Sequence, residues 1–237
     1  FLLYFHIFIK TNGQFRPICA GVPYPPLISH PKIMFCRIAL LAILAPLVFI
    51  TASCGSKYDD RNKMVVSVRD QKMLLVKDGK PVKAYPVSTS KFGLGSRSGT
   101  NRTPLGRLEV AKKVGGGAPS GAVFKSRRRT GEVIRPDTPG RDPIVTRILW
   151  LRGKESHNRN TMGRCIYIHG TPAERHIGRP ASYGCIRMKS RHVIDLYERV
   201  GVGADVQIIR GSLDTTSAGR SYYARHGGRP RATATRW

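Results

Sequence analysis

The sequence predicts a mostly β domain of the sandwich or barrel type, with one helix late in the chain. Three observations indicate this fold class. Short runs of β-branched and apolar residues recur, turn signals separate them, and only one segment has apolar residues at helical spacing. The domain is expected between residues 64 and 211, a length typical of a single globular unit.

The strands are predicted from short apolar segments that end at turn signals. Asp78-Gly79 is the strongest signal, since this dipeptide favours a tight hairpin turn. Pro86 favours an edge strand or a bulge, because proline cannot donate to a strand ladder. The predicted strands cover residues 64–68, 73–76, 81–88, 106–114, 145–153, 165–170 and 204–211.

One segment is predicted as a helix, and three are predicted without regular structure. In residues 189–200, apolar side chains recur at helical spacing. Residues 55–63 are polar and are interpreted as a linker. Residues 115–144 are rich in Gly, Pro and Arg and are interpreted as a long loop. Residues 212–237 have no apolar pattern, so a disordered basic tail is expected.

The beginning of the chain is interpreted as a targeting region outside the fold. Residues 1–33 are apolar and then Pro-rich without a period, and we expect them to lie upstream of the native start at Met34. The apolar run from Ile38 to Ile50 is too short to span a bilayer comfortably. Residues 34–54 are therefore predicted to be a signal peptide.

The end of this segment reads TASC and resembles the lipobox of bacterial lipoproteins, whose cysteine receives the lipid. Cys54 is then the expected lipidation site, although Thr51 stands where leucine is usual. A plain secretory signal cleaved nearby and an uncleaved anchor are the alternatives. Each route predicts the cell envelope as the location, in the periplasm or on the outer face of a membrane, with attachment through the signal or a lipid.

The charge of the chain predicts a surface that prefers polyanions. There are 41 Lys and Arg against 14 Asp and Glu, a formal charge of +27. Nucleic acid, anionic lipid and acidic cell-wall polymer all suit that charge. No nucleic acid is expected as a partner, because the sequence has no helix-turn-helix, RNP or zinc-finger pattern and contains a signal-like segment from Met34 to Cys54. Residues 1–53 hold four of the basic residues and no acids, so the basicity belongs to the body of the chain.

The cysteines do not form a recognisable metal or disulfide pattern. They lie at positions 19, 36, 54, 165 and 185, with no CxxC pair. This spacing disfavours zinc-ribbon and thioredoxin-like sites, and an odd number disfavours a complete disulfide framework. We expect neither a metal nor a cofactor.

Cys185 lies in the stretch SYGCIRM, between a predicted strand and the predicted helix. A cysteine near a helix N-terminus has its thiolate favoured, and Gly184 permits a sharp turn before it. His169 ends the preceding strand and is a candidate to take the thiol proton. The amides around Gly184 and Cys185 are candidate oxyanion donors, and the planar fork of Arg187 suits a carboxylate.

The residues alone leave other interpretations of Cys185 open. It could fill the core as a small apolar side chain. It could pair with Cys165 in a disulfide. It could also join His169, Cys165 and either His176 or His192 in a zinc site, although the spacing matches no familiar zinc pattern.

The segment HGTPAERHIGRPASYGCIRM, residues 169–188, resembles the signature of the L,D-transpeptidases, the YkuD-type catalytic domain. That signature has a His-Gly segment, a gap in the mid-teens, and a Ser/Thr-His-Gly-Cys stretch. Upstream, QKMLLVKDGKPVKAYPVSTS is similar to the opening hairpins of the family, and RTPLG to its Thr-Pro-x-Gly turn. The resemblance covers residues 64–210 and implies a β-sandwich-like catalytic domain with a cysteine at the base of a cleft.

The resemblance also implies a chemistry. Cys185 would attack a diaminopimelate carbonyl in a peptidoglycan stem tetrapeptide, releasing D-Ala, and an amine would resolve the acyl-enzyme. His169 corresponds to the base, with its other ring nitrogen held by the Gly170 carbonyl. Ser182 and Gly184 correspond to the loop that shapes the nucleophile. Candidate substrate-binding residues are Arg187, Tyr183, Tyr167 and Thr171.

One departure from the family pattern concerns the base. The family often has histidine two residues before the cysteine, where this chain has Tyr183, so the role of base falls on His169. His176, inside the intervening segment, is the competing candidate. The expected partners are stem peptides and an acceptor envelope protein, and a monomer is expected. The alternatives are a carboxypeptidase that uses water as acceptor and a catalytically silent wall-binding domain.

Overall fold

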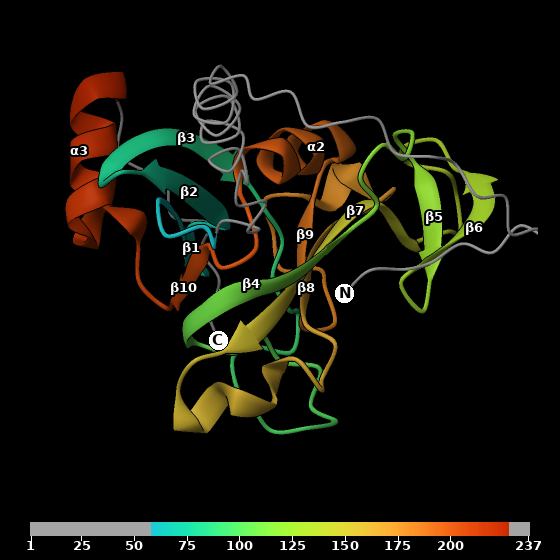
Figure 1. Ribbon diagram of the computed structural model, residues 1–237, viewed down its shortest axis with the longest axis horizontal. Helices are drawn as coiled ribbons and strands as arrows, with labels where there is room; N and C mark the ends of the chain where they lie inside the picture. The colour runs from blue at the N-terminus through green and yellow to red at the C-terminus, as the bar shows by residue number, and fades with distance from the viewer. Residues whose placement is uncertain (1–57, 228–237) are drawn as a thin grey trace, which may run out of the picture. The chain divides into compact units, whose positions relative to one another are not determined.

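The computed structural model describes residues 58–227, which form a ten-stranded mixed sheet with helices packed on it (Figure 1). The main strand order is β3-β2-β1-β10-β4-β7-β5-β6, and β8 pairs with both β7 and β9. The mostly β prediction is confirmed. The strands are β1 (Asn62–Ser67), β2 (Lys72–Lys77), β3 (Lys80–Pro86), β4 (Gly106–Val114), β5 (Ala122–Lys125), β6 (Arg128–Val133), β7 (Ile144–Gly153), β8 (Tyr167–Gly170), β9 (Ile186–Met188) and β10 (Asp205–Ile209).

The helices of the described residues are short. They are α2 (Ser190–Arg199), α3 (Ser217–His226) and the 3-10 turns η2 (Ser156–Thr161), η3 (Glu174–His176) and η4 (Leu213–Thr215). None of them has the length and apolar character that a bilayer crossing needs. The expectations for residues 1–33, for the signal peptide at 34–54 and for Cys54 fall outside the described residues.

The hairpin predicted from Asp78-Gly79 joins β2 to β3. The two residues have φ angles of 50° and 74°, the left-handed conformation that a tight two-residue hairpin turn requires. Pro86 is the last residue of β3, which lies at the edge of the sheet, as a residue without a backbone donor should. Both predictions are confirmed.

The main core lies between the sheet and helix α2. Val193, Leu196 and Tyr197 are buried on the face of α2 that packs on β7 and β8. Their spacing of three and four residues is the pattern that predicted this helix. Side chains from β1, β2, β4, β10 and the central part of β7 complete the same cluster.

Strand β7 has three neighbours, β4, β5 and β8, and so sets where the short strand β8 lies. Val145 of β7 faces Gly170 at the end of β8. A Cβ on Gly170 would stand 2.6 Å from the Val145 carbonyl oxygen, so the strands approach this closely because residue 170 is glycine.

The long loop expected at residues 115–144 contains a hairpin instead. Strands β5 and β6 pair with each other, and β5 pairs with β7 (Figure 1, right). The turn residues Ser126 and Arg127 have positive φ, a conformation usually marked in sequence by Asn or Gly. Strand β6 is exposed throughout, so it has no apolar alternation to reveal it.

The disordered tail expected from residue 212 is wrong for the described part of it. Helix α3 begins after Thr216, whose hydroxyl accepts a hydrogen bond from the Gly219 amide at 3.0 Å. Tyr222 and Tyr223 pack on the side of the sheet opposite the main core. Figure 1 shows α3 beside β3. The described residues therefore contain two α-helices, where one was expected.

The linker expected at residues 55–63 is packed onto the domain from Tyr58 onward. The Asp59 carboxylate accepts hydrogen bonds from the amides of Asn62 and Gly201, at 3.0 and 2.5 Å. A Cβ on Gly203 would meet the Tyr58 ring at 2.6 Å, so this ring lies directly on the backbone before β10. The polar residues of this segment thus form hydrogen bonds with the domain instead of a solvated linker.

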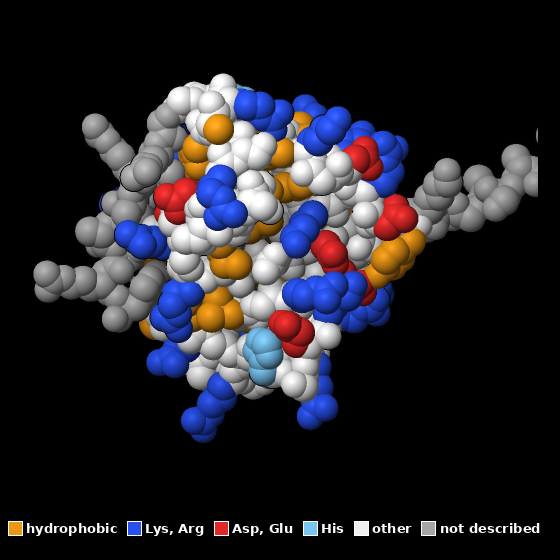
Figure 2. All heavy atoms as spheres, turned by 90° about the vertical axis from the view of Figure 1, so that its left-hand side faces the viewer, with side chains coloured by type: hydrophobic (Ala, Val, Ile, Leu, Met, Phe, Trp, Pro, Cys, Tyr) orange, Lys and Arg blue, Asp and Glu red, His pale blue; other side chains and the backbone are white. Residues whose placement is uncertain are grey.

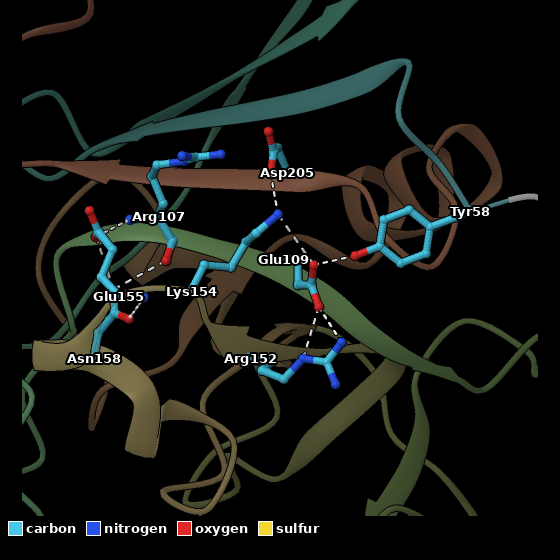
Figure 3. Close-up of polar contacts among 8 residues, drawn as sticks. All are labelled: Tyr58, Arg107, Glu109, Arg152, Lys154, Glu155, Asn158 and Asp205. Carbon is cyan, nitrogen blue, oxygen red and sulfur yellow. Dashed lines mark hydrogen bonds and ion pairs between the residues drawn. The ribbon is translucent and has the colours of Figure 1, made fainter.

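Glu109 of β4 is the centre of a polar cluster that joins this segment to the sheet (Figure 3). Its buried carboxylate accepts hydrogen bonds from the Tyr58 hydroxyl and from Arg152, whose Nε lies 2.8 Å away. Lys154 bridges Glu109 and Asp205 at 3.5 and 3.4 Å. Burial acts to raise the pKa of Glu109, but the hydrogen bonds outweigh it and lower the pKa below its ordinary value.

We expect Glu109→Ala to lower the free energy of unfolding by about 1–3 kcal/mol, because it removes a buried acceptor with several donors. Urea unfolding at pH 7 measures this, with the exposed Glu198→Ala as the control, expected to change stability by no more than about 0.5 kcal/mol. The lowered pKa makes the contribution of Glu109 complete above its ordinary pKa of 4.5 and smaller as the pH falls below it. Equal effects of the two substitutions would contradict the role of the cluster.

Candidate active site

The parallel pairing of β8 with β9 brings the predicted catalytic residues onto one face of the sheet. Ile168 pairs with Ile186, and His169 pairs with Arg187. By the same register, Cys185 lies beside Tyr167, the first residue of β8. Because alternate residues of a strand share a face, Cys185 and His169 lie on the face opposite the core residues Ile168 and Ile186.

The Cys185 thiol is half-buried and contacts the chain before β8. Its Sγ accepts a hydrogen bond from the Tyr167 amide and donates one to the Cys165 carbonyl, each at 3.4 Å. Burial raises the pKa of the Cys185 thiol to about 11, although the Tyr167 amide and Arg187 act in the opposite direction. The resting thiol is therefore protonated at neutral pH and needs a base before it can act as a nucleophile.

His169 is buried, with 4% of its surface exposed, and is held by one hydrogen bond. Its Nδ1 lies 2.8 Å from the Gly170 carbonyl oxygen, which accepts only, so Nδ1 carries the proton and Nε2 has a free lone pair. Burial lowers the pKa of His169 to about 4, so the imidazole is neutral at pH 7. Within the described residues no hydrogen bond joins this ring to the thiol, and catalytic hydrogen bonds often form only with substrate bound.

The loop before Cys185 is held by hydrogen bonds from Ser182. The Ser182 hydroxyl donates to the Cys185 carbonyl at 2.6 Å and accepts from the Gly184 amide at 3.2 Å. Thr103 donates to the Gly184 carbonyl at 3.0 Å. Gly184 has φ of 115°, and a Cβ there would lie 3.2 Å from Ile166, so both conformation and space favour glycine. Since Ser182 occupies the Gly184 amide, the Cys185 amide is the candidate oxyanion donor.

Arg187 and Thr171, two candidate substrate-binding residues, share a partner that the sequence did not reveal. The Arg187 guanidinium lies 2.7 Å from the Asp142 carboxylate, and its side chain is only 10% exposed. The Thr171 hydroxyl donates to the same carboxylate at 2.6 Å. Asp142 sits in the loop before β7, in a segment with no sequence signal for a site. The guanidinium predicted to orient a substrate is thus neutralised by Asp142.

The two candidate tyrosines lie in different surroundings. Tyr167 is buried, packs against Trp150, and its hydroxyl accepts a hydrogen bond from Arg127 at 3.2 Å. Tyr183 is 55% exposed and its ring packs at a tilt of 53° against Phe92, with the Lys91 ammonium 4.4 Å from its ring centroid. Tyr183 therefore belongs to the surface rim of the site.

The other interpretations of Cys185 can be compared with the structure. Both cysteines of the described chain, Cys165 and Cys185, are free. No group of three or more His, Cys, Asp or Glu side chains suited to a metal occurs among residues 58–227. His176, the competing base, lies on η3 and accepts a hydrogen bond from Arg175 at 3.4 Å, with no contact to the thiol.

Comparisons with known proteins identify the family of the chain. The family model described as the L,D-transpeptidase catalytic domain matches residues 61–208. YqjB of Bacillus subtilis, named as an L,D-transpeptidase, is 28% identical over 145 residues, which are 61% of this chain and 69% of that protein. YbiS of Escherichia coli K12, also named as an L,D-transpeptidase, is 39% identical over 56 residues, 24% of this chain and 18% of that protein.

Several solved structures with low sequence identity to this chain are also named as L,D-transpeptidases. L,D-transpeptidase 3 from Mycobacterium tuberculosis is 19% identical, with a TM-score of 0.42, covering 63% of this chain and 61% of that one. The L,D-transpeptidase from Xylanimonas cellulosilytica is 18% identical, with a TM-score of 0.41, covering 64% and 61%. The chain thus spans about three fifths of these solved chains. Since the family model matches more than half of the sequence, the chain belongs to the L,D-transpeptidase catalytic-domain family.

Proposed function

We propose that this chain is a cysteine-dependent L,D-transpeptidase that acts on peptidoglycan stem peptides. The observation that supports this most directly is the β8–β9 register, which puts Cys185 and His169 on the same face of the sheet. The free Nε2 lone pair of a neutral His169 is the base that a protonated thiol requires. The family match supplies the substrate class.

The proposed reaction begins with attack of Cys185 Sγ on the carbonyl of the L-centre of diaminopimelate in a stem tetrapeptide. The thiol proton passes to His169 Nε2, and a thioester forms as the bond to the terminal D-Ala breaks. The imidazolium then gives its proton to the departing amine. The candidate donor for the oxyanion is the Cys185 amide.

The acceptor decides the product. An amine of a second stem gives a 3→3 crosslink, and an amine of an envelope protein gives a protein–peptidoglycan link. Water gives a carboxypeptidase instead. A wall-binding domain without catalysis is the remaining alternative, and the presence of Tyr183 in place of a second histidine favours it.

We also propose export to the cell envelope, which rests on the signal-like residues 34–54. A basic surface suits that location, because peptidoglycan stems carry carboxylates. On the face drawn in Figure 2, Lys and Arg side chains outnumber acidic ones and are spread over the whole view. This distribution favours weak attraction to an acidic polymer over a single binding patch.

The identity of the nucleophile can be tested with a carbapenem, a β-lactam that would acylate a reactive thiol. We expect wild-type protein to gain one covalent adduct by intact mass spectrometry, and Cys185→Ala to gain none. Cys165→Ala is the matched control and should be acylated like the wild type. Cys165 is an exposed free thiol, but no histidine of the described chain lies beside it to take its proton, so it is not expected to react. An adduct that persists in Cys185→Ala would refute the assignment.

The pH dependence tests the base. Because the pKa of His169 is lowered to about 4, the imidazole stays neutral down to that pH, and kcat/KM for D-Ala release should hold to about pH 5. Activity should then fall as the pH drops through about 4 and the ring becomes protonated. A midpoint near the ordinary value of 6.5 would contradict the buried neutral base.

His169→Asn should lower kcat by roughly 100-fold or more at pH 7.

A further inference from the structure

A pocket of about 370 Å³ borders the loop that carries Cys185, and its lining includes neither His169 nor the ion-paired Arg187 and Asp142. Tyr183, two residues before the nucleophile, forms one wall, and Ile166, whose Cδ1 packs against Gly184, forms the next. The remaining lining is mainly polar and includes Ser98, Asn101, Asn160 and Arg164.

Arg164 is the charged group of this pocket, and it is held in place by backbone. Its Nη1 donates to the Gly95 carbonyl at 3.2 Å, and its Nη2 donates to the Arg102 carbonyl at 2.6 Å. A guanidinium has five N–H donors in a planar fork, so three remain after these two bonds. The two carbonyls fix the plane of the fork without neutralising its charge.

Arg164 has no acidic partner anywhere in the described chain, in contrast to Arg187. Its side chain is partly buried, and this burial lowers its pKa from the ordinary value, with no carboxylate of residues 58–227 close enough to act in the opposite direction. A partly buried arginine that is held by backbone carbonyls and has no acidic partner within the described part of the protein is suited to bind an anionic group of a ligand.

The pocket is close to the reacting sulfur. Cys165, the residue after Arg164, accepts the hydrogen bond from Cys185 Sγ through its carbonyl at 3.4 Å. The positive charge of Arg164 is near enough to act on the Cys185 thiol, whose pKa it lowers slightly against the effect of burial. An anionic group bound in the pocket would therefore belong to a peptide whose scissile carbonyl lies at Cys185.

We propose that Arg164 binds a carboxylate of the stem-peptide substrate and so determines specificity for the free acid. This inference rests on the proposed function, and it assigns a specificity-determining role to a residue outside the family motif. The tetrapeptide offers two such groups near the scissile bond, the carboxylate of the leaving D-Ala and the side-chain carboxylate of diaminopimelate. Each can accept a paired hydrogen bond from a guanidinium fork.

The test measures kcat and KM for release of the terminal residue from three peptides: the stem tetrapeptide, its C-terminal amide, and the tetrapeptide amidated on the diaminopimelate side chain. For wild-type protein, one of the two amidations should raise KM by about 10- to 100-fold, since a charge-assisted hydrogen bond is lost. Arg164→Gln should raise KM for the free acid by the same factor. Arg164→Gln should not change KM for the amidated peptide that the wild type binds more weakly. The position of the amide in that peptide identifies the carboxylate that Arg164 binds.

Arg159→Gln is the matched control, because Arg159 is an exposed arginine on η2 that does not line the pocket. It should keep the full preference for the free acid. Arg164→Lys keeps the charge without the fork and should restore the preference in part. Thermal unfolding midpoints equal to that of the wild type confirm that each variant is folded.

Two outcomes overturn the inference while the proposed function stands. In one, Arg164→Gln slows all three peptides equally, which indicates a structural role for the bonds to Gly95 and Arg102. In the other, Arg164→Gln keeps the preference for the free acid. If the wild type releases no residue from any peptide in a Cys185-dependent reaction, the proposed function fails and the inference fails with it.

Discussion

The parallel pairing of β8 with β9 is the constraint on which the site depends. Two parallel neighbouring strands need a connection that runs from the end of the first strand back to the end of the sheet where that strand began. Residues 171–185 make this connection between β8 and β9. Ser182 and Thr103 fix its last residues by hydrogen bonds to the backbone around Gly184. A slip of one residue would turn Cys185 toward the core face, where Ile186 now lies, and would remove the thiol from the face of His169.

The parts of the fold that are encoded locally could be predicted from the sequence. The Asp78-Gly79 turn and helix α2 each depend on a few neighbouring residues, and both lie where they were expected. The β5–β6 hairpin was missed because its Ser126-Arg127 turn uses a conformation without its usual residues. Helix α3 was missed because it packs beside β3 and on an apolar cluster from β1 and β2, all of which are far away in the sequence.

At the site, too, the sequence motif predicts which residues take part, whereas their charge and hydrogen-bond partners depend on distant segments. The motif identified which residues gather, but the state of each depends on partners from distant segments. Asp142 neutralises Arg187, so the arginine that the motif marks is occupied by the protein itself. Arg164, which no motif marks, keeps its charge uncompensated among the described residues. Long-range pairing of charges cannot be derived from local patterns, because it depends on which loops meet.

The protonated state of the half-buried Cys185 thiol has a consequence for chemical damage. Peroxide and related oxidants attack the thiolate far faster than the thiol, so a cysteine with a pKa of about 11 is nearly inert to them at neutral pH. At the location proposed for this protein, outside the cytoplasm, an oxidised sulfur is reduced again less readily than inside the cell. An enzyme that ionises its sulfur only in the presence of substrate would survive between turnovers in surroundings where a permanently ionised cysteine would be consumed.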